Sequence, residues 1–244
     1  MQNSLRKGTL RPLAAEVSCL NRADGSAKFS SGSTQILAAV FGPASPKIPS
    51  KERSNEAMIC VVFKHGTTKA SSADNTSTAV MGYGATEREL ERFIADALIS
   101  CVAVDKYART VIEVVIQVIT ADGSLVSTAL NAAGLALMDA GIEMKSVPIG
   151  TTCLVKSNGS DNYDEIIFDP SAKNESSEDH SVIILATDSV REGVIASMNF
   201  GNFQLNNFLA CVEGSSRASK AVLAFMRIVI EQKVTREAKT LWST

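Results

Sequence analysis

The sequence predicts an α/β (α+β) protein with mixed sheets and packed helices, arranged in two halves that each run from strands into a helix. The clearest evidence is a β-branched run, residues 111–120, which ends at a turn and passes directly into an alanine-rich segment. Val and Ile fill a pleated surface well, so the run predicts a buried strand. The segment after the turn is apolar nearly all round, which is typical of a helix packed between layers.

Short apolar runs separated by turn residues predict the other strands. Clusters of Gly, Asp, Asn and Ser lie between these runs, and such clusters favour turns. We expect these strands at residues 15–20, 26–30, 35–41, 57–63, 150–156, 165–168, 182–186 and 193–198. Residues 64–84 are rich in Ser, Thr, Gly and Ala, have no period, and predict a loop.

Two further segments, residues 86–104 and 205–234, carry apolar residues three and four positions apart and predict helices. Gly214 lies inside the second of these helices, where we expect a break or a kink. The alanine-rich helix should be capped by Asp122 or Ser124. A helix N-terminus that faces a turn offers free N–H groups and a favourable dipole, so this junction is a candidate anion site.

Length and composition favour one folded domain over residues 1–244, with residues 1–9 as a flexible lead. The sequence has no apolar stretch near eighteen residues and no secretory signal core, so no membrane span is expected. The five cysteines are scattered and lack metal-binding spacing, which favours reduced thiols in a cytoplasmic or nuclear protein. A net charge of −2 argues against a surface that grips nucleic acid everywhere but permits a local basic path.

Three segments together resemble a known family. They are LRP with RADGSAKFSSGSTQILAAVFGP near the start, VIQVITADGSLVSTALNAAGLALMDAGI in the middle, and IIFDP at residues 166–170. These segments resemble the RNase PH family, which contains phosphorolytic exoribonucleases and subunits of the RNA exosome ring. The resemblance covers nearly the whole chain. It implies an RNase PH-like fold in two βαβα-like halves, with other ring subunits of that fold as partners.

The same resemblance implies that the phosphate ligands are missing. Active family members hold the attacking phosphate with a Thr and an Arg after the turn, and with a further Arg ahead of the first long helix. The matching residues in this sequence are Leu125, Val126 and Thr86. A guanidinium can clamp phosphate through two hydrogen bonds, and a hydrocarbon side chain cannot. We therefore expect phosphorolysis to be lost.

Asp169 and Glu175 match a pair of family carboxylates, one of which is thought to act as a general acid with magnesium nearby. Two carboxylates at a strand end could hold Mg²⁺ or donate a proton. With Asp164 or Glu178 they could also hold a metal that activates water. The plainer interpretation, which we favour, is that Asp169 caps a turn and Glu175 is a surface charge.

Four basic residues are candidates for contact with RNA. Lys64 and Lys69 lie in the predicted loop 64–84, which the resemblance places near the RNA path of the family, and Arg92 matches a family arginine. Arg88 and Arg92 are four positions apart, so they share a helix face and can point at one backbone phosphate. Pairing with the interleaved glutamates is the competing interpretation for both arginines.

The sequence as a whole predicts a non-catalytic, RNase PH-like subunit of the RNA exosome core ring, without a metal or cofactor. It would support 3′–5′ RNA processing and degradation, including that of ribosomal RNA, by scaffolding and by guiding single-stranded RNA. The expected locations are the nucleus, the nucleolus and the cytoplasm, with no membrane partner. A homodimer is possible when the chain is alone.

The alternative is a stand-alone nuclease, hydrolytic or weakly phosphorolytic, that uses Asp169 on RNA or DNA and requires Mg²⁺. A small-molecule kinase would need a glycine-rich phosphate loop, and the sequence ADGSLVS is too short and too apolar for one.

Overall fold

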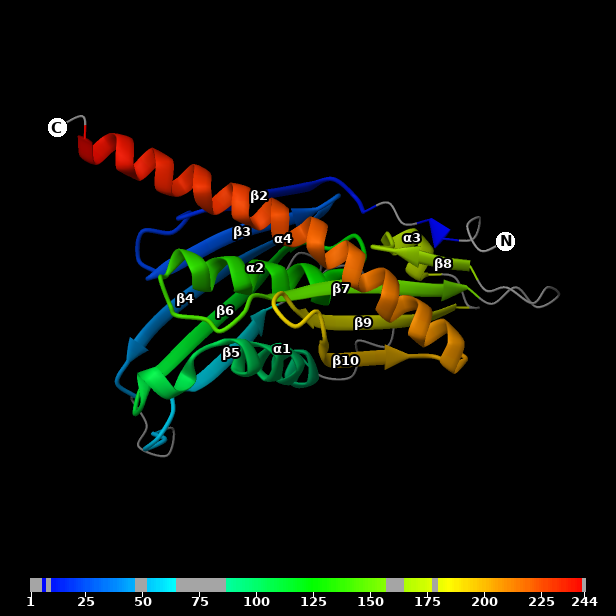
Figure 1. The fold of residues 1–244 in the computed structure, drawn as a ribbon, viewed down its shortest axis with the longest axis horizontal. Helices are drawn as coiled ribbons and strands as arrows, with labels where there is room; N and C mark the ends of the chain where they lie inside the picture. The colour runs from blue at the N-terminus through cyan, green and yellow to red at the C-terminus, as the bar shows by residue number, and fades with distance from the viewer. Residues whose placement is uncertain are drawn as a thin grey trace, which may run out of the picture.

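Two five-stranded sheets and a helix that packs against both of them form the body of the protein, drawn in Figure 1 from a computed structural model. The structure describes residues 6–7, 10–46, 52–64, 87–156, 165–176 and 180–242. In these parts of the chain, no helix has an apolar stretch that could cross a membrane.

The first sheet has the strand order β2-β3-β4-β6-β5. Its strands are β2 (Leu13–Val17), β3 (Gly25–Ser31), β4 (Thr34–Ala44), β5 (Met58–Lys64) and β6 (Val111–Thr120). The first four in this order pair antiparallel, whereas β5 runs parallel to β6. Parallel neighbours need a crossover, and here it contains the helix α1 (Glu87–Cys101) and the short 3₁₀ helix η2 (Val104–Tyr107).

The second sheet has the strand order β1-β8-β7-β9-β10. Its strands are β1 (Arg6–Lys7), β7 (Pro148–Lys156), β8 (Glu165–Phe168), β9 (His180–Asp188) and β10 (Val194–Phe200). The short strand β1 pairs parallel with β8, and the other pairs are antiparallel. Both sheets are therefore mixed, and the expected fold class is confirmed.

The alanine-rich helix α2 (Leu125–Asp139) is buried along nearly its whole length, as its sequence predicts. It packs on β3 and β4 of the first sheet and on β7 of the second, so one core extends across both sheets. Small side chains allow this close approach. The side chain of Asn131 on α2 makes two hydrogen bonds to the backbone of Gly150 on β7. Its Nδ2 donates to the Gly150 carbonyl at 3.1 Å, and its Oδ1 accepts from the Gly150 N–H at 2.8 Å.

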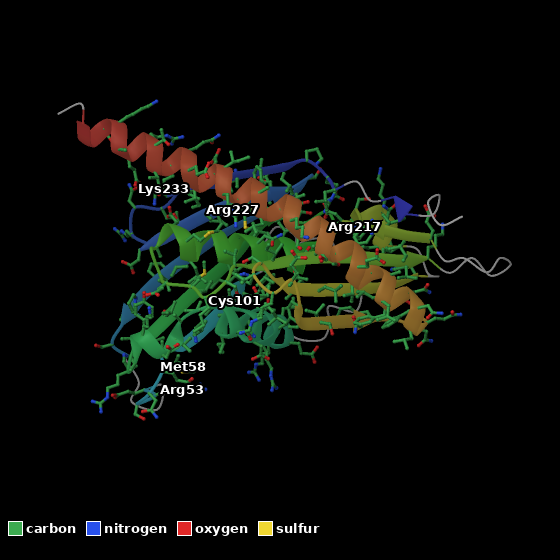
Figure 2. All side chains as sticks on the ribbon, in the orientation of Figure 1. Arg53, Met58, Cys101, Arg217, Arg227 and Lys233 are labelled. Atoms are coloured by element: carbon green, nitrogen blue, oxygen red, sulfur yellow. The ribbon has the colours of Figure 1, made fainter. Side chains whose placement is uncertain are left out.

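The last helix, α4 (Leu205–Trp242), runs without interruption for 38 residues and lies diagonally across the molecule (Figure 1). The expectation of a break at Gly214 was therefore wrong. A side chain there would place its Cβ 2.1 Å from the ring of Phe168, so this glycine lets the helix pack closely on β8. Further along, Lys233 donates to the buried carboxylate of Asp139 at 2.6 Å and fastens α4 to the end of α2 (Figure 2).

Two local expectations also need correction. Between the strands expected at residues 165–168 and 182–186, where we expected no helix, the chain forms a four-residue helix, α3 (Ala172–Glu175), which is too short to leave a periodic signal in the sequence. The cap of α2 is Ser124, but its hydroxyl makes no capping hydrogen bond. The reason is that Ser124 adopts a left-handed conformation, with φ of 50°, and its hydroxyl donates to the carbonyl of Pro170 at 3.1 Å.

The close contact between α2 and β7 predicts that Gly150→Ala destabilises the protein. The new Cβ would lie 2.7 Å from the backbone of Ser127, so helix and strand must separate. We expect the free energy of unfolding to fall by about 1–3 kcal/mol, measured by urea denaturation. Gly193→Ala is the matched control because nothing lies within 4 Å of its Cβ position. Equal effects of the two substitutions would contradict this account of the packing.

Candidate functional site

The turn between β6 and α2 is locked by a second segment that is far away in sequence. Gly123 has φ of +76°, and a Cβ on it would lie 2.4 Å from the carbonyl oxygen of Pro170. The carboxylate of Asp122 accepts the N–H of Ala172 at 3.2 Å. The turn 121–124 and the acidic segment 169–175 therefore pack directly on each other, as a site built from both would require.

Asp169 is held at this junction by two residues that sequence analysis did not select. One carboxylate oxygen accepts the guanidinium of Arg11 at 2.8 Å, and the other accepts the hydroxyl of Ser31 at 2.6 Å. The backbone N–H of Arg11 donates to the same carboxylate at 3.2 Å. The carboxyl side chain is only 9% exposed. Asp169 therefore joins β3, β8 and the segment before β2.

Arg11 also holds the turn before α2. Its guanidinium donates to the carbonyl oxygens of Asp122 at 2.6 Å and Gly123 at 3.4 Å, in addition to its ion pair with Asp169. The side chain is 17% exposed. Two of its nitrogens are thus engaged with protein oxygens, and Nε is buried without a hydrogen-bond partner in the described part of the chain. Arg11 lies in the LRP motif, which is the one sequence signal that could have identified it.

Glu175 is buried, and the expectation that it is a surface charge was wrong. Only 3% of the residue is exposed, and its carboxylate accepts the N–H of Ser124 at 2.9 Å. Ser124 is the cap residue of α2, so the carboxylate lies at the positive end of the helix dipole. The place where the sequence predicts an external anion is therefore occupied by a carboxyl group of the chain itself.

The first two residues of α2 offer nothing polar from their side chains. Leu125 is 2% exposed and Val126 is fully buried, so both side chains point into the core. A cavity of about 20 Å³ beside Asp169 is lined partly by Ser31, Ser127 and Thr128. That volume suits about one water molecule and is too small for a phosphate ion. Thr86, the third position expected to have lost a phosphate ligand, lies outside the described residues.

The pKa values of Asp169 and Glu175 are shifted in opposite directions. Burial raises the pKa of Asp169, but the hydrogen bonds from Arg11 and Ser31 outweigh burial, so its pKa lies below the ordinary value. Burial dominates at Glu175 and raises its pKa, although the Ser124 N–H opposes the shift. Asp169 is therefore ionised at neutral pH and unsuited to donate a proton. Glu175 is the better proton donor of the two.

The described residues do not group three metal-ligating side chains of His, Cys, Asp or Glu at this site or elsewhere. Asp164 and Glu178, the two further carboxylates considered from sequence, lie outside the described residues. Asp169 and Glu175 are oxygen donors that suit Mg²⁺ in principle, but their oxygens already accept hydrogen bonds from Arg11, Ser31 and Ser124.

Three of the four basic candidates are described, and they lie on two elements that pack against each other, β5 and α1. Lys64 is the exposed last residue of β5, and Arg88 and Arg92 are exposed on the first turns of α1. The N–H of Phe63 donates to Glu91 at 2.9 Å, which fixes the start of α1 beside the end of β5. Arg92 lies 3.9 Å from Asp96, whereas Arg88 makes no ion pair within the described segments. Lys69 lies outside them.

The chain belongs to the 3′ exoribonuclease family, because the family model for domain 1, named RNase PH, matches residues 9–143. Among individual relatives, the exosome complex exonuclease RRP46 homolog of Arabidopsis thaliana is 29% identical over 93% of this chain and 94% of its own length. The RRP46 homolog of Oryza sativa subsp. japonica is 30% identical, with 92% of each chain covered.

Solved structures agree with the sequence relatives. The crystal structure of rice Rrp46 matches with a TM-score of 0.76 and 30% identity, covering 90% of this chain and 95% of the other. A chain of an archaeal exosome core matches with a TM-score of 0.70 over 90% of this chain and 88% of its own, and at 20% identity it supports the fold alone. The family resemblance expected from the three sequence segments is confirmed.

The buried ion pair between Arg11 and Asp169 predicts that Asp169→Asn lowers the free energy of unfolding by an amount that depends on pH. A carboxyl group whose pKa is lowered by folding stabilises the native state above its unfolded pKa, near 3.9. This contribution disappears as the pH falls through the lower pKa of the folded state. Urea denaturation at pH 7 should show the variant destabilised by about 2 kcal/mol or more, because Arg11 is left buried and unpaired.

The difference between wild type and Asp169→Asn should narrow steadily below about pH 4. Asp96→Asn is the matched control, since its carboxylate is largely exposed and its loss should have little effect at any pH. A destabilisation that stays constant from pH 7 to pH 3 would show that the carboxylate charge is not the cause.

Proposed function

We propose that this chain is a non-catalytic, RNase PH-fold subunit of an RNA exosome core ring that supports 3′–5′ RNA processing and degradation. One observation carries the non-catalytic part: Arg11 and Ser31 bind Asp169, the carboxylate that phosphorolysis or hydrolysis would need. The ring assignment is supported by the RRP46 homologs that match over more than nine-tenths of the chain. The archaeal exosome core supports it through its fold.

Phosphorolysis needs a site that holds an inorganic phosphate next to the RNA 3′ end. In this chain the N-terminus of α2 faces the Glu175 carboxylate, and Leu125 and Val126 supply only buried hydrocarbon. An incoming phosphate would meet carboxylates at Asp122, Asp169 and Glu175, with one guanidinium that is already paired. Repulsion between like charges and the loss of phosphate hydration both oppose binding. We therefore expect no phosphate-dependent activity.

RNA guidance is assigned to the edge formed by Lys64, Arg88 and Arg92, with Lys69 as a further candidate. Lys64 extends from the end of β5, and Arg88 and Arg92 extend from one face of α1. A few basic side chains are enough to bind the phosphates of a single-stranded RNA. The proposed partners are other RNase PH-fold subunits and single-stranded RNA, with no membrane. The proposed locations are the nucleus, the nucleolus and the cytoplasm, and ribosomal RNA is among the proposed substrates of the assembly.

A stand-alone nuclease is the second candidate, and the opposite pKa shifts of Asp169 and Glu175 favour it. Two neighbouring carboxyl groups, one with a lowered pKa and one with a raised pKa, can serve as a general base and a general acid. Only in this alternative does the site require Mg²⁺. Asp169 would then have to leave Arg11 during each reaction cycle, which weighs against it.

Degradation of a 3′-tailed, single-stranded RNA by the purified chain tests the two candidates. Wild type and Asp169→Asn are assayed with and without inorganic phosphate and Mg²⁺. We expect no shortening of the RNA in any reaction. Shortening by wild type that Asp169→Asn abolishes, while circular dichroism shows the variant folded, would establish the nuclease and refute the scaffold.

The proposed RNA edge predicts different effects for its two helical arginines. Arg88→Ala should weaken binding of single-stranded RNA by about two- to fivefold and reduce the slope of log affinity against log salt by about 0.7. Arg92→Ala should have a smaller effect, because Asp96 already offsets part of its charge. Filter binding at several salt concentrations measures the affinity and the salt dependence for both variants.

Arg217→Ala is the matched control for this measurement. Arg217 lies on α4, not on β5 or α1, and it pairs with Glu213 on the same helix. If Arg88→Ala and Arg217→Ala bind RNA equally well, the edge does not guide RNA.

A further inference from the structure

Two of the five cysteines, Cys153 on β7 and Cys211 on α4, meet where the last helix covers the second sheet. Both residues are fully buried and belong to one small apolar cluster between α4 and that sheet. Both are free thiols. A disulfide requires two sulfur atoms that face each other, so the orientation of these two side chains decides whether one can form.

Contacts around the pair orient the two thiols toward each other. The Cys153 sulfur lies 3.5 Å from the hydroxyl oxygen of Ser215. Ser215 and Cys211 share one face of α4, because they are four residues apart. Burial, followed by a hydrogen bond between the thiols of Cys153 and Cys211, raises the pKa of Cys153. The two sulfurs therefore lie within hydrogen-bonding distance of each other.

The helix turn that carries Cys211 is fixed on the sheet by its neighbours. The hydroxyl of Ser215 accepts a hydrogen bond from the hydroxyl of Thr151 at 2.9 Å. Gly214 lies against the ring of Phe168, which is the strand partner of Cys153 on β8. These contacts keep the pair aligned, so the sulfurs can approach by side-chain rotation while the helix and the strand stay in place.

We propose that Cys153 and Cys211 are a reversible redox pair, which hydrogen peroxide oxidises to a disulfide that clamps α4 to β7. One thiolate attacks the peroxide, so that the O–O bond breaks, a sulfenic acid forms and water leaves. The second thiol then attacks the sulfenic sulfur and releases a second water. Two thiols and one peroxide thus give one disulfide and two waters. A small thiol reductant reverses the change by thiol–disulfide exchange.

Burial determines how fast this bond forms and how long it lasts. The attacking species is the thiolate, and the raised pKa of Cys153 keeps its thiolate fraction small at neutral pH. Oxidation is therefore slow and becomes faster as the pH rises, and the reduced pair is the resting state. Once formed, the bond closes the long loop between residues 153 and 211, which restricts the unfolded chain and stabilises the folded one.

The clamp would act on the part of α4 that lies behind the candidate site. Cys153 pairs with Phe168, and the next residue is Asp169, whose carboxylate Arg11 binds. A bond from Cys153 to Cys211 therefore connects α4 covalently to the strand beside this junction. The proposal concerns the attachment of α4 and does not depend on whether the chain binds or degrades RNA.

Thiol labelling after oxidation tests the proposal. The purified chain is treated with hydrogen peroxide, unfolded and labelled with a maleimide, and the labels are located by peptide mass spectrometry. Untreated protein should take five labels, and treated protein should lose those at Cys153 and Cys211. The two peptides should be linked, and dithiothreitol should restore both labels. The melting temperature should rise by at least about 5 °C on oxidation and return on reduction.

Cys153→Ser and Cys211→Ser should each remove the linkage and the rise in melting temperature, with circular dichroism as the check on folding. Cys101→Ser is the matched control and should keep both effects. Cys101 is equally buried, but it lies at the end of α1 (Figure 2), where its thiol interacts with Ser146.

Labelling of wild type decides the proposal even where a variant does not fold. The proposal is overturned if Cys153 and Cys211 keep their labels after peroxide treatment, or if either is linked to a different cysteine. It is also overturned if dithiothreitol does not restore the labels, or if the linked protein melts at the same temperature as the reduced one.

Discussion

The ion pair between Arg11 and Asp169 is the interaction on which the arrangement of this site depends. It connects residues 158 positions apart in the chain and joins the segment before β2 to the end of β8. Because Arg11 also binds the carbonyl oxygens of the turn before α2, three separate segments converge on one guanidinium. A buried ion pair is costly to form and far more costly to break by removing one member. The two sheets and the central helix are therefore fixed relative to one another at this junction.

The same residues that make this junction rigid also determine its charge. Asp169 is kept ionised by its partners, and Glu175 is kept at the N-terminus of α2 by burial and by the Ser124 N–H. The site thus contains its own carboxyl groups, and Arg11 balances the charge of Asp169. The family fold is present, and the polar groups at this junction bind one another, so the function of the site has to be argued from these contacts and not from the fold.

Much of the fold follows from the sequence because its elements are long and strongly patterned. The β-branched run of β6 and the small residues of α2 define a strand and a buried helix without further information. The short helix α3 was not predictable, since four residues cannot show a helical period. Gly214 was misinterpreted because a glycine that permits close packing has the same sequence signature as one that ends a helix.

The candidate site was only half predictable. Its acidic residues and the apolar positions Leu125 and Val126 could be placed by motif, and the structure brings Asp169 and Glu175 to the same turn. The role of Arg11 could not be inferred, because nothing local in a sequence indicates which distant carboxylate an arginine will meet. Glu175 was expected on the surface since glutamate is rarely buried, and only the tertiary contact with Ser124 explains why it is buried here.

The contact between Glu91 and the N–H of Phe63 affects how this protein behaves at high concentration. β5 is the last strand of its sheet in the described chain, and an open strand edge can template the addition of a foreign strand. A carboxylate from α1 accepts a hydrogen bond from that strand and places a negative charge beside it. Backbone pairing by a stray segment would have to displace this charge. The helix that carries Arg88 and Arg92 thus also places a carboxylate against the open edge of this sheet.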